Sequence, residues 1–331
     1  MTYKTTIEYA INKEIVKYED VFVFEDLPNE RFYEELYNFC SENLEIQYAD
    51  GLLFKNLFLY TNCYSKNAKA GIEKEHNVIL FNIGLMNFCF EKFLYNMELN
   101  EYTNGKWEKI TESFDTSVSH LAFQINTHFT YYHELAHLFQ MQKKRAEIGF
   151  QERCTDDRYD IIQHKLEINA DTYAAINIAT QIQQYIEKCF DEIDQRIVTK
   201  VVTILGTCLL EHIICFSDSF ELYYDEKSHP HPIMRMFNII LNVTNHLSSN
   251  PAYVKKGINL DIGLLVRKIL DFHKELERKE IFTSGFSNFI NSETLDNAKI
   301  LEHFEAIREL DESDGYFDAM DIWNSRVGSI A

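Results

Sequence analysis

Residues 118–142 read VSHLAFQINTHFTYYHELAHLFQMQ, and this stretch decides how the chain is expected to fold. Apolar residues recur in it every three or four positions, which predicts an amphipathic helix of about six turns. The expected buried stripe comprises Val118, Leu121, Ala122, Ile125, Phe129, Tyr132, Ala136 and Phe139. A second helix is expected from about 160 to 186, and its small residues Ala170, Ala174 and Ala175 would let a neighbouring helix approach closely.

The first 110 or so residues have a different pattern, with short apolar runs typical of strands. Strands are expected at 21–24, 52–60 and 77–81, and a helix at 30–44. The sequence therefore predicts a helix-rich α+β fold. An α/β N-terminal lobe, residues 1–142, would end in the helix quoted above, and residues 143–331 would form a mostly helical C-terminal lobe. The two lobes could equally form one continuous domain.

The composition of the chain favours long helices and argues against some classes of binding partner. The chain has 331 residues, only 4 Pro and 11 Gly, and a formal charge of −20. Few helix breakers favour long helices. The negative charge argues against binding to nucleic acid or to an anionic membrane surface. The N-terminus has no apolar segment typical of a secretion signal, and the apolar run at 201–216 is too short to span a bilayer. A cytoplasmic protein is expected.

The predicted helix contains His133-Glu134-Leu-Ala-His137, an H-E-x-x-H motif. Residues four apart lie one above the other on a helix, so both imidazoles can bind the same ion. Each histidine follows a residue of the apolar stripe, so the pair should lie at the edge of the buried face, where a cleft could reach it. Glu134 could then face the open side of the metal.

The second predicted helix offers Glu167-Ile-Asn-Ala-Asp171, in which the two carboxylates are also four residues apart. Zinc held by two imidazoles and one carboxylate keeps a fourth position for water. We therefore expect one Zn²⁺ per chain, bound by His133, His137 and Glu167. A ligating imidazole also needs an acceptor for its second ring nitrogen. Asp171 is the expected acceptor, with His133 as its partner.

Together these motifs resemble the gluzincins, the thermolysin-like zinc metallopeptidases, which have a zincin-like fold. The resemblance covers residues 118–179. It implies that His133, His137 and Glu167 bind zinc, that Glu134 activates water as general base, and that Asp171 orients a histidine. The chain also resembles the phage-exclusion Lit-type peptidases, intracellular zinc proteases of similar size, on these same motifs. Metzincins do not fit, because they need Gly and His after the motif, where this chain has Gln140 and Lys143.

A third segment contains His229-Pro-His-Pro-Ile-Met-Arg235, with Pro232 expected in the first turn of a new helix. Some gluzincin-like families carry an H-P-x-x-x-x-R element after the third ligand, and this segment has the same spacing. The resemblance implies that His229 or Arg235 stabilises an oxyanion. His231 competes equally with His229 for that role.

The expected function is that of a zinc-dependent metallopeptidase acting on proteins or peptides. Two alternatives remain open: a zinc-binding sensor or interaction protein without catalysis, and a di-iron carboxylate oxidoreductase. The second rests on Glu73-x-x-His76, which together with the motif would give paired E-x-x-H elements. His164, three residues before Glu167, is expected on a helix surface. The sequence does not indicate the oligomeric state.

Overall fold

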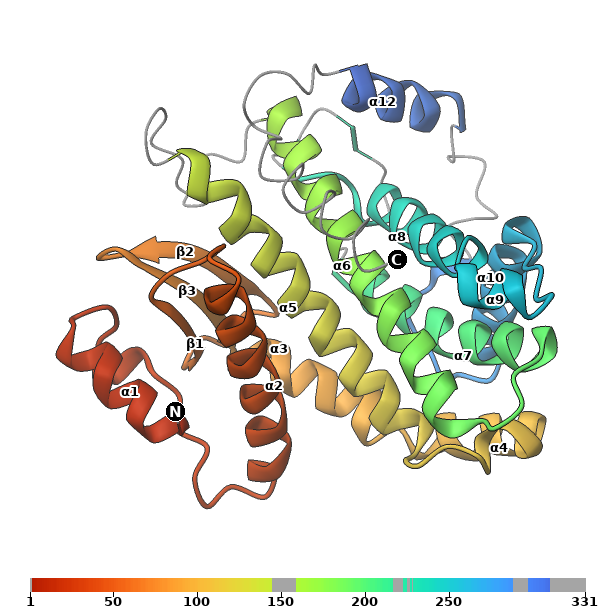
Figure 1. Cartoon of the computed structure of the whole chain (residues 1–331), viewed down its shortest axis with the longest axis horizontal. Helices are drawn as coiled ribbons and strands as arrows, with labels where there is room; N and C mark the ends of the chain where they lie inside the picture. Colours follow the sequence, from red (N-terminus) through yellow and green to blue (C-terminus); the bar gives the residue numbers. More distant parts are fainter. Residues whose placement is uncertain are drawn as a thin grey trace. The chain divides into compact units, whose positions relative to one another are not determined.

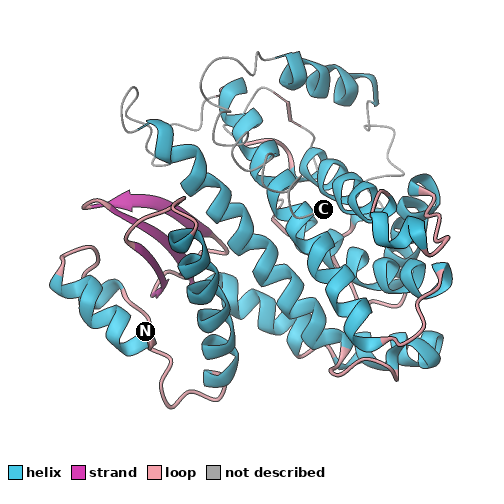
Figure 2. Ribbon diagram, viewed as in Figure 1, coloured by secondary structure: helices cyan, strands magenta, loops and turns pink. Residues whose placement is uncertain are grey.

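The structure, a computed structural model, describes residues 2–144, 159–216, 223–224, 227, 229–287 and 297–309. Helices dominate the described chain, and one small sheet accompanies them, so the predicted helix-rich α+β class is confirmed (Figure 2). The described residues form two compact units. The first contains those up to Cys89 and from Thr130 to 144, and the second contains those from Phe90 to Phe129 and from 159 to 309.

The first unit contains a three-stranded sheet in the order β1-β3-β2, in which β1 and β3 are parallel and β2 and β3 antiparallel. Helices α1 and α2 both pack on β1, and α3 continues directly from β3 (Figure 1). The bounds are α1 Tyr3–Asn12, α2 Glu30–Ala49, β1 Asn56–Thr61, β2 Ala68–Glu73, β3 His76–Asn82 and α3 Ile83–Cys89.

The predictions for this unit are only partly right. The helix at 30–44 and the strand at 77–81 are confirmed as α2 and β3, whereas the strand at 52–60 begins only at Asn56. The strand predicted at 21–24 is wrong, because that segment makes a single bridge, Val21 to Thr61. Its Phe24 instead stacks on Tyr3, with ring centroids 4.7 Å apart. Aromatic packing therefore explains the apolar pattern of 21–24.

Strand β2 was missed because its sequence, AKAGIE, lacks the β-branched and aromatic runs typical of strands. It pairs with β3 in a hairpin that sets Glu73 directly opposite His76. These two residues therefore belong to strands. The helical E-x-x-H element that a di-iron bundle requires does not form there.

The second unit is helical. Helix α8 packs on α6, α7 and α10, and α12 packs on α6 (Figure 1). Helix α5 is continuous and contributes its first half to this unit and the remainder to the first unit. The bounds are a π-helix at Phe90–Leu94, then α4 Met97–Thr111, α5 Val118–Lys144, α6 Ile161–Cys189, α7 Gln195–Ile214, α8 Pro232–Ser248, α9 Pro251–Lys255, α10 Ile262–Arg278 and α12 Asn297–Glu309.

Helix α7 is long and apolar enough to cross a membrane by length and composition, but 83% of that apolar stretch is buried inside the protein, as in an ordinary core helix. Its Glu211 has no exposed surface and accepts hydrogen bonds from Lys92 and His273, at 2.6 and 2.7 Å. Burial alone would raise the pKa of Glu211, but these two partners outweigh it and lower the pKa to about 2. The charge on α7 is therefore neutralised inside the helical unit.

Candidate metal centre

The helix that carries the H-E-x-x-H motif is buried on almost every side. From Val118 to Met141, every residue of α5 is buried except His120, Gln124 and His128, which are half-buried. The predicted apolar stripe is present, but the expected polar and accessible opposite face is not. Other parts of the chain cover that face, and sequence periodicity along one helix does not report what covers it.

The two motif histidines face each other on α5. Their rings are perpendicular, and Nε2 of His137 lies 3.1 Å from Nε2 of His133. Nδ1 of His137 donates to Oε1 of Gln140 at 2.8 Å, so this ring presents the lone pair of Nε2 to its neighbour. Two imidazole nitrogens this close require a proton or a cation between them.

Gln140 is a residue of the candidate site that the sequence did not predict. Its Oε1 fixes the tautomer of His137 and turns the Nε2 of that ring towards His133. The i, i+3 spacing of the two residues on one helix was the signal that could have found it.

Glu167 of α6 completes the cluster. His133, His137 and Glu167 are all buried, and each offers a ligand atom that lies within 4.8 Å of the other two. Two nitrogens bound tetrahedrally to a metal at about 2.0–2.1 Å stand roughly 3.3 Å apart, close to the 3.1 Å found between the two rings. The donor set can therefore bind a metal ion. Glu134, which lies between the two histidines in the motif, is also buried.

Residues at the N-terminal ends of α6 and α8 explain where these two helices begin. Asp160 caps α6 by accepting from the backbone N–H of Ile162 at 2.9 Å, so the second predicted helix is confirmed, and it ends three residues later than predicted. Pro232 opens α8, as predicted. The helices pack closely, and Nδ2 of Asn238 donates to the carbonyl of Ile168.

Asp171 is fully buried beside Arg235 of α8. The guanidinium donates from Nε and Nη2 to the two carboxylate oxygens, at 2.8 and 2.7 Å. Its Nη2 also lies 3.9 Å from Oε2 of Glu167. One guanidinium thus approaches both carboxylates that the sequence singled out. The expected hydrogen bond from His133 to Asp171 stays a prediction.

His229 and His231, which the sequence left as equals, have different surroundings. His231 is buried and caps α8, because its Nδ1 accepts from the backbone N–H of Ile233 at 3.2 Å. The side chain of His229 is 61% exposed, and its Nε2 lies 3.5 Å from Oε1 of Glu167. His231 therefore has a structural role at the helix start, and His229 is the one of the two that approaches Glu167.

A second histidine pair holds the backbone beside His229. His164 of α6 is fully buried, which corrects its expected place on a helix surface. Its Nε2 donates to the carbonyl of Lys227 at 2.9 Å. Its Nδ1 therefore accepts, and the donor is Nε2 of His303 in α12, 3.0 Å away. Burial lowers the pKa of His164, which favours the neutral ring that this arrangement needs.

Comparison with known proteins agrees with the chemistry of the cluster. Residues 100–254 match the family model Peptidase U49, and this region contains the H-E-x-x-H motif, Glu167, Asp171, His229 and Arg235. In this region the chain is therefore similar to a peptidase family. No curated protein and no solved structure matches the chain.

Proposed function

We propose that this chain is a zinc-dependent metallopeptidase of the gluzincin type. The observation that carries the proposal is the buried group of His133, His137 and Glu167, inside the region that matches a peptidase family. Two imidazoles and one carboxylate are a donor set that suits zinc and leaves a coordination position open. Bound zinc would supply the Lewis acidity that polarises a peptide carbonyl and acidifies water.

Two residues near the cluster, Glu134 and His229, have separate proposed roles in catalysis. Glu134 acts as the general base: its carboxylate accepts a proton from the attacking water and passes it to the nitrogen of the leaving amine. Its place between the two histidines of the motif supports this role. His229 would donate a hydrogen bond to the oxyanion of the tetrahedral intermediate, and its exposure and its approach to Glu167 support this role.

Arg235 serves mainly to position other groups. Its Nε and Nη2 groups already donate to Asp171, and Nη2 also lies 3.9 Å from Glu167. It therefore orients the third ligand, Glu167, and contact with the oxyanion is its second proposed role. In solution we expect a cytoplasmic enzyme that binds neither nucleic acid nor membranes, given the formal charge of −20.

Zinc content tests the site. The purified chain should carry about one zinc by mass spectrometry, and His133→Ala, His137→Ala and Glu167→Ala should each lose most of it. His120→Ala is a matched control, because His120 is a half-buried histidine of the same helix whose Nδ1 bonds to Thr116. Full zinc in the three ligand variants would refute the site.

Hydrolysis tests the mechanism separately. Glu134→Gln should keep its zinc but cleave casein, used as an unfolded protein probe, at least about 100-fold more slowly, as loss of a general base predicts. A Glu134→Gln variant that cleaves casein at the wild-type rate would exclude Glu134 as the base. A protein that binds zinc but hydrolyses neither casein nor a mixed peptide library would favour the sensor alternative.

A further inference from the structure

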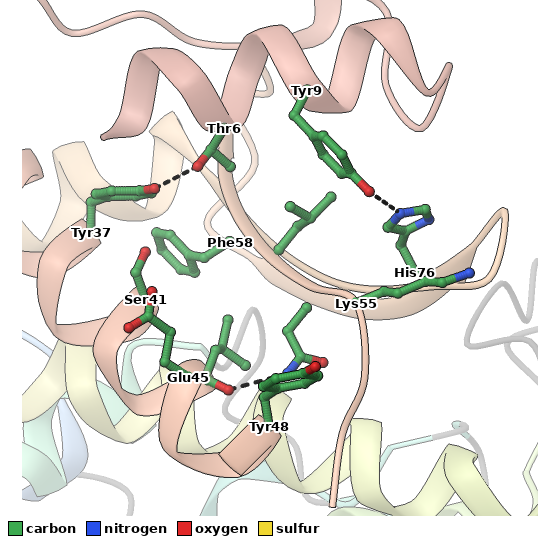
Figure 3. Close-up of a pocket in the computed structure, with 12 residues that line it drawn as sticks. Thr6, Tyr9, Tyr37, Ser41, Glu45, Tyr48, Lys55, Phe58 and His76 are labelled. Atoms are coloured by element: carbon green, nitrogen blue, oxygen red, sulfur yellow. Dashed lines mark hydrogen bonds between the residues drawn. The ribbon is translucent and has the colours of Figure 1, made fainter. Parts of the chain in front are cut away.

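The first unit contains a cavity that none of the site residues described above lines. It has a volume of about 300 Å³ and lies among α1, α2, β1 and the start of β3 (Figure 3). Volumes of this size are at the lower end of pockets that bind small groups in proteins. Its wall of ring-bearing side chains includes Tyr9, Tyr37, Tyr48, Phe58 and His76.

The polar groups of the cavity wall are largely bonded to one another. The hydroxyl of Tyr9 lies 2.9 Å from Nε2 of His76, whose Nδ1 donates to the carbonyl of Lys74 at 2.8 Å. Tyr9 is therefore the donor in the first of these bonds. The hydroxyls of Thr6 and Tyr37 bond to each other at 2.6 Å (Figure 3). An occupant gains little from these groups by polar contact.

Two more polar side chains, Asn56 and Lys55, are similarly occupied, whereas the exposed Glu45 adds a carboxylate to the cavity wall. Nδ2 of Asn56 donates to the carbonyls of Leu44 and Leu53, and its Oδ1 accepts from Asn77. The ammonium of Lys55 is paired with Glu75 at 2.9 Å, outside the cavity. An anionic ligand would lose its hydration beside the carboxylate of Glu45, which is unfavourable. The cavity therefore suits an apolar group.

Exposed aromatic side chains beside the cavity indicate which class of molecule supplies the apolar group. Tyr48, which lines the cavity, is 60% exposed and touches the ring of Phe54, which is 56% exposed. Large apolar side chains that gather in solvent mark surfaces that bind other proteins. A small ligand would fill the cavity and leave these side chains uncovered.

We propose that this cavity is an exosite that receives an aromatic side chain from a polypeptide substrate, with the flanking chain covering Tyr48 and Phe54. The flanks should be basic, because α2 carries five Glu and one Arg, and the nearby Lys55 is already neutralised by Glu75. Opposite charges would speed and strengthen this binding at low salt. That the polypeptide is a substrate rests on the peptidase function proposed above.

Helix α2 connects this cavity to the motif helix within the first unit. On one face it presents Tyr37, Ser41 and Tyr48 to the cavity. On another, the carbonyl of Cys40 and Oδ1 of Asn43 accept from the hydroxyl of Tyr131, at 3.3 and 3.1 Å. Tyr131 precedes His133 by two residues on α5. A polypeptide held in the cavity would thus bind the same unit as both motif histidines.

Binding is measured on the full chain with the Glu134→Gln substitution, so that no probe is cleaved. The probes are 12-residue Gly/Ser peptides with a central Trp or Ala, flanked by Lys or by Glu. By calorimetry, the Trp peptide with Lys flanks should bind at least about tenfold more tightly than its Ala counterpart, as expected for a buried aromatic anchor. The Glu-flanked Trp peptide should bind more weakly, and added salt should reduce that difference.

Two substitutions locate the binding. Ser41→Trp should fill the cavity and reduce affinity for the Trp peptide at least about tenfold, and Tyr48→Ala should weaken it by trimming the exposed rim. Tyr18→Ala removes a tyrosine outside the cavity that is 71% exposed, against 60% for Tyr48, and should have no effect. Thermal unfolding checks that each variant is folded, and Tyr48→Ala remains informative if Ser41→Trp is not.

Three results would overturn the proposal: equal affinity for the Trp and Ala peptides, unchanged binding by both cavity variants, or binding of N-acetyl-tryptophanamide as tight as that of the peptide. The last would identify a small-molecule pocket. The failure of the peptidase function is separate, since these measurements need neither zinc nor turnover. If casein is cleaved, Tyr48→Ala should raise KM for casein and leave kcat unchanged.

Discussion

Removal of the Arg235 guanidinium is the most direct test of how the candidate site is held together. Arg235→Met deletes two hydrogen bonds, of 2.8 and 2.7 Å, to a carboxylate of Asp171 that has no exposed surface. Breaking such a buried pair from one side typically costs about 3–5 kcal/mol, because a charge stays buried without its partner. Since the Arg235 side chain is 18% exposed, we expect the lower end, about 3 kcal/mol of the free energy of unfolding.

Urea unfolding of the full chain at pH 7 in zinc-free buffer, followed by circular dichroism, measures this loss. Arg235→Lys should be intermediate, because it keeps the charge but not the paired donors. Arg267→Met, an exposed arginine on α10, is the matched control and should change stability by less than about 0.5 kcal/mol. The double variant Arg235→Met/Asp171→Leu should recover most of the loss, because no charge is then left alone.

The same variant tests the effect on the metal. Nη2 of Arg235 also lies 3.9 Å from Glu167, so Arg235→Met should weaken zinc binding by roughly 10–100-fold. The reasoning is refuted if Arg235→Met costs less than about 1 kcal/mol, or if the double variant is no more stable than the single one. Either result would mean that Asp171 has its main partner elsewhere.

Two further predictions follow from other histidines. His303→Ala removes the donor to His164, so backbone amides near Lys227 and His229 should exchange hydrogen faster, and casein cleavage should slow while zinc content stays unchanged; unaltered exchange would contradict a positioning role for α12. Burial lowers the pKa of His128 to about 4, so the unfolded chain binds a proton below pH 6.5 that the folded chain does not. Stability should therefore fall by about 3 kcal/mol between pH 6.5 and 4, and His128→Gln should reduce that loss in pH-dependent urea unfolding; an equal loss in both proteins would exclude His128 as the cause.

Secondary structure could be predicted from the sequence where a single local signal, such as hydrophobic periodicity, dominates. Helix α2, strand β3 and the start of α6 at Asp160 follow from periodicity and capping, which depend on residues close in sequence. The segment 21–24 was misread because an apolar pattern does not distinguish strand pairing from aromatic stacking, as of Phe24 on Tyr3. Strand β2 went unseen because pairing with β3 stabilises a sequence with little strand propensity of its own.

Burial was the least predictable property. The apolar run at 201–216 is interrupted by Glu211 and His212, yet both are buried in α7. Lys92 forms an ion pair with Glu211 and His273 donates a hydrogen bond to it, and both come from segments far away in the chain. Likewise, nothing local to α5 predicts that its polar face is covered as fully as its apolar one. Burial depends on what packs against a helix, and the periodicity of that helix contains no such information.

For the candidate site, the sequence by itself determined the donor types and their spacing: two histidines four apart on one helix and a carboxylate on another. Helical geometry is local, so it fixes which residues share a face. Only the tertiary structure decided the partners. It paired Asp171 with Arg235, gave His231 to a helix cap, set His229 beside Glu167, and fixed the His164 tautomer through Lys227 and His303. These contacts join residues up to 139 positions apart, and chain folding alone brings such residues within hydrogen-bond distance.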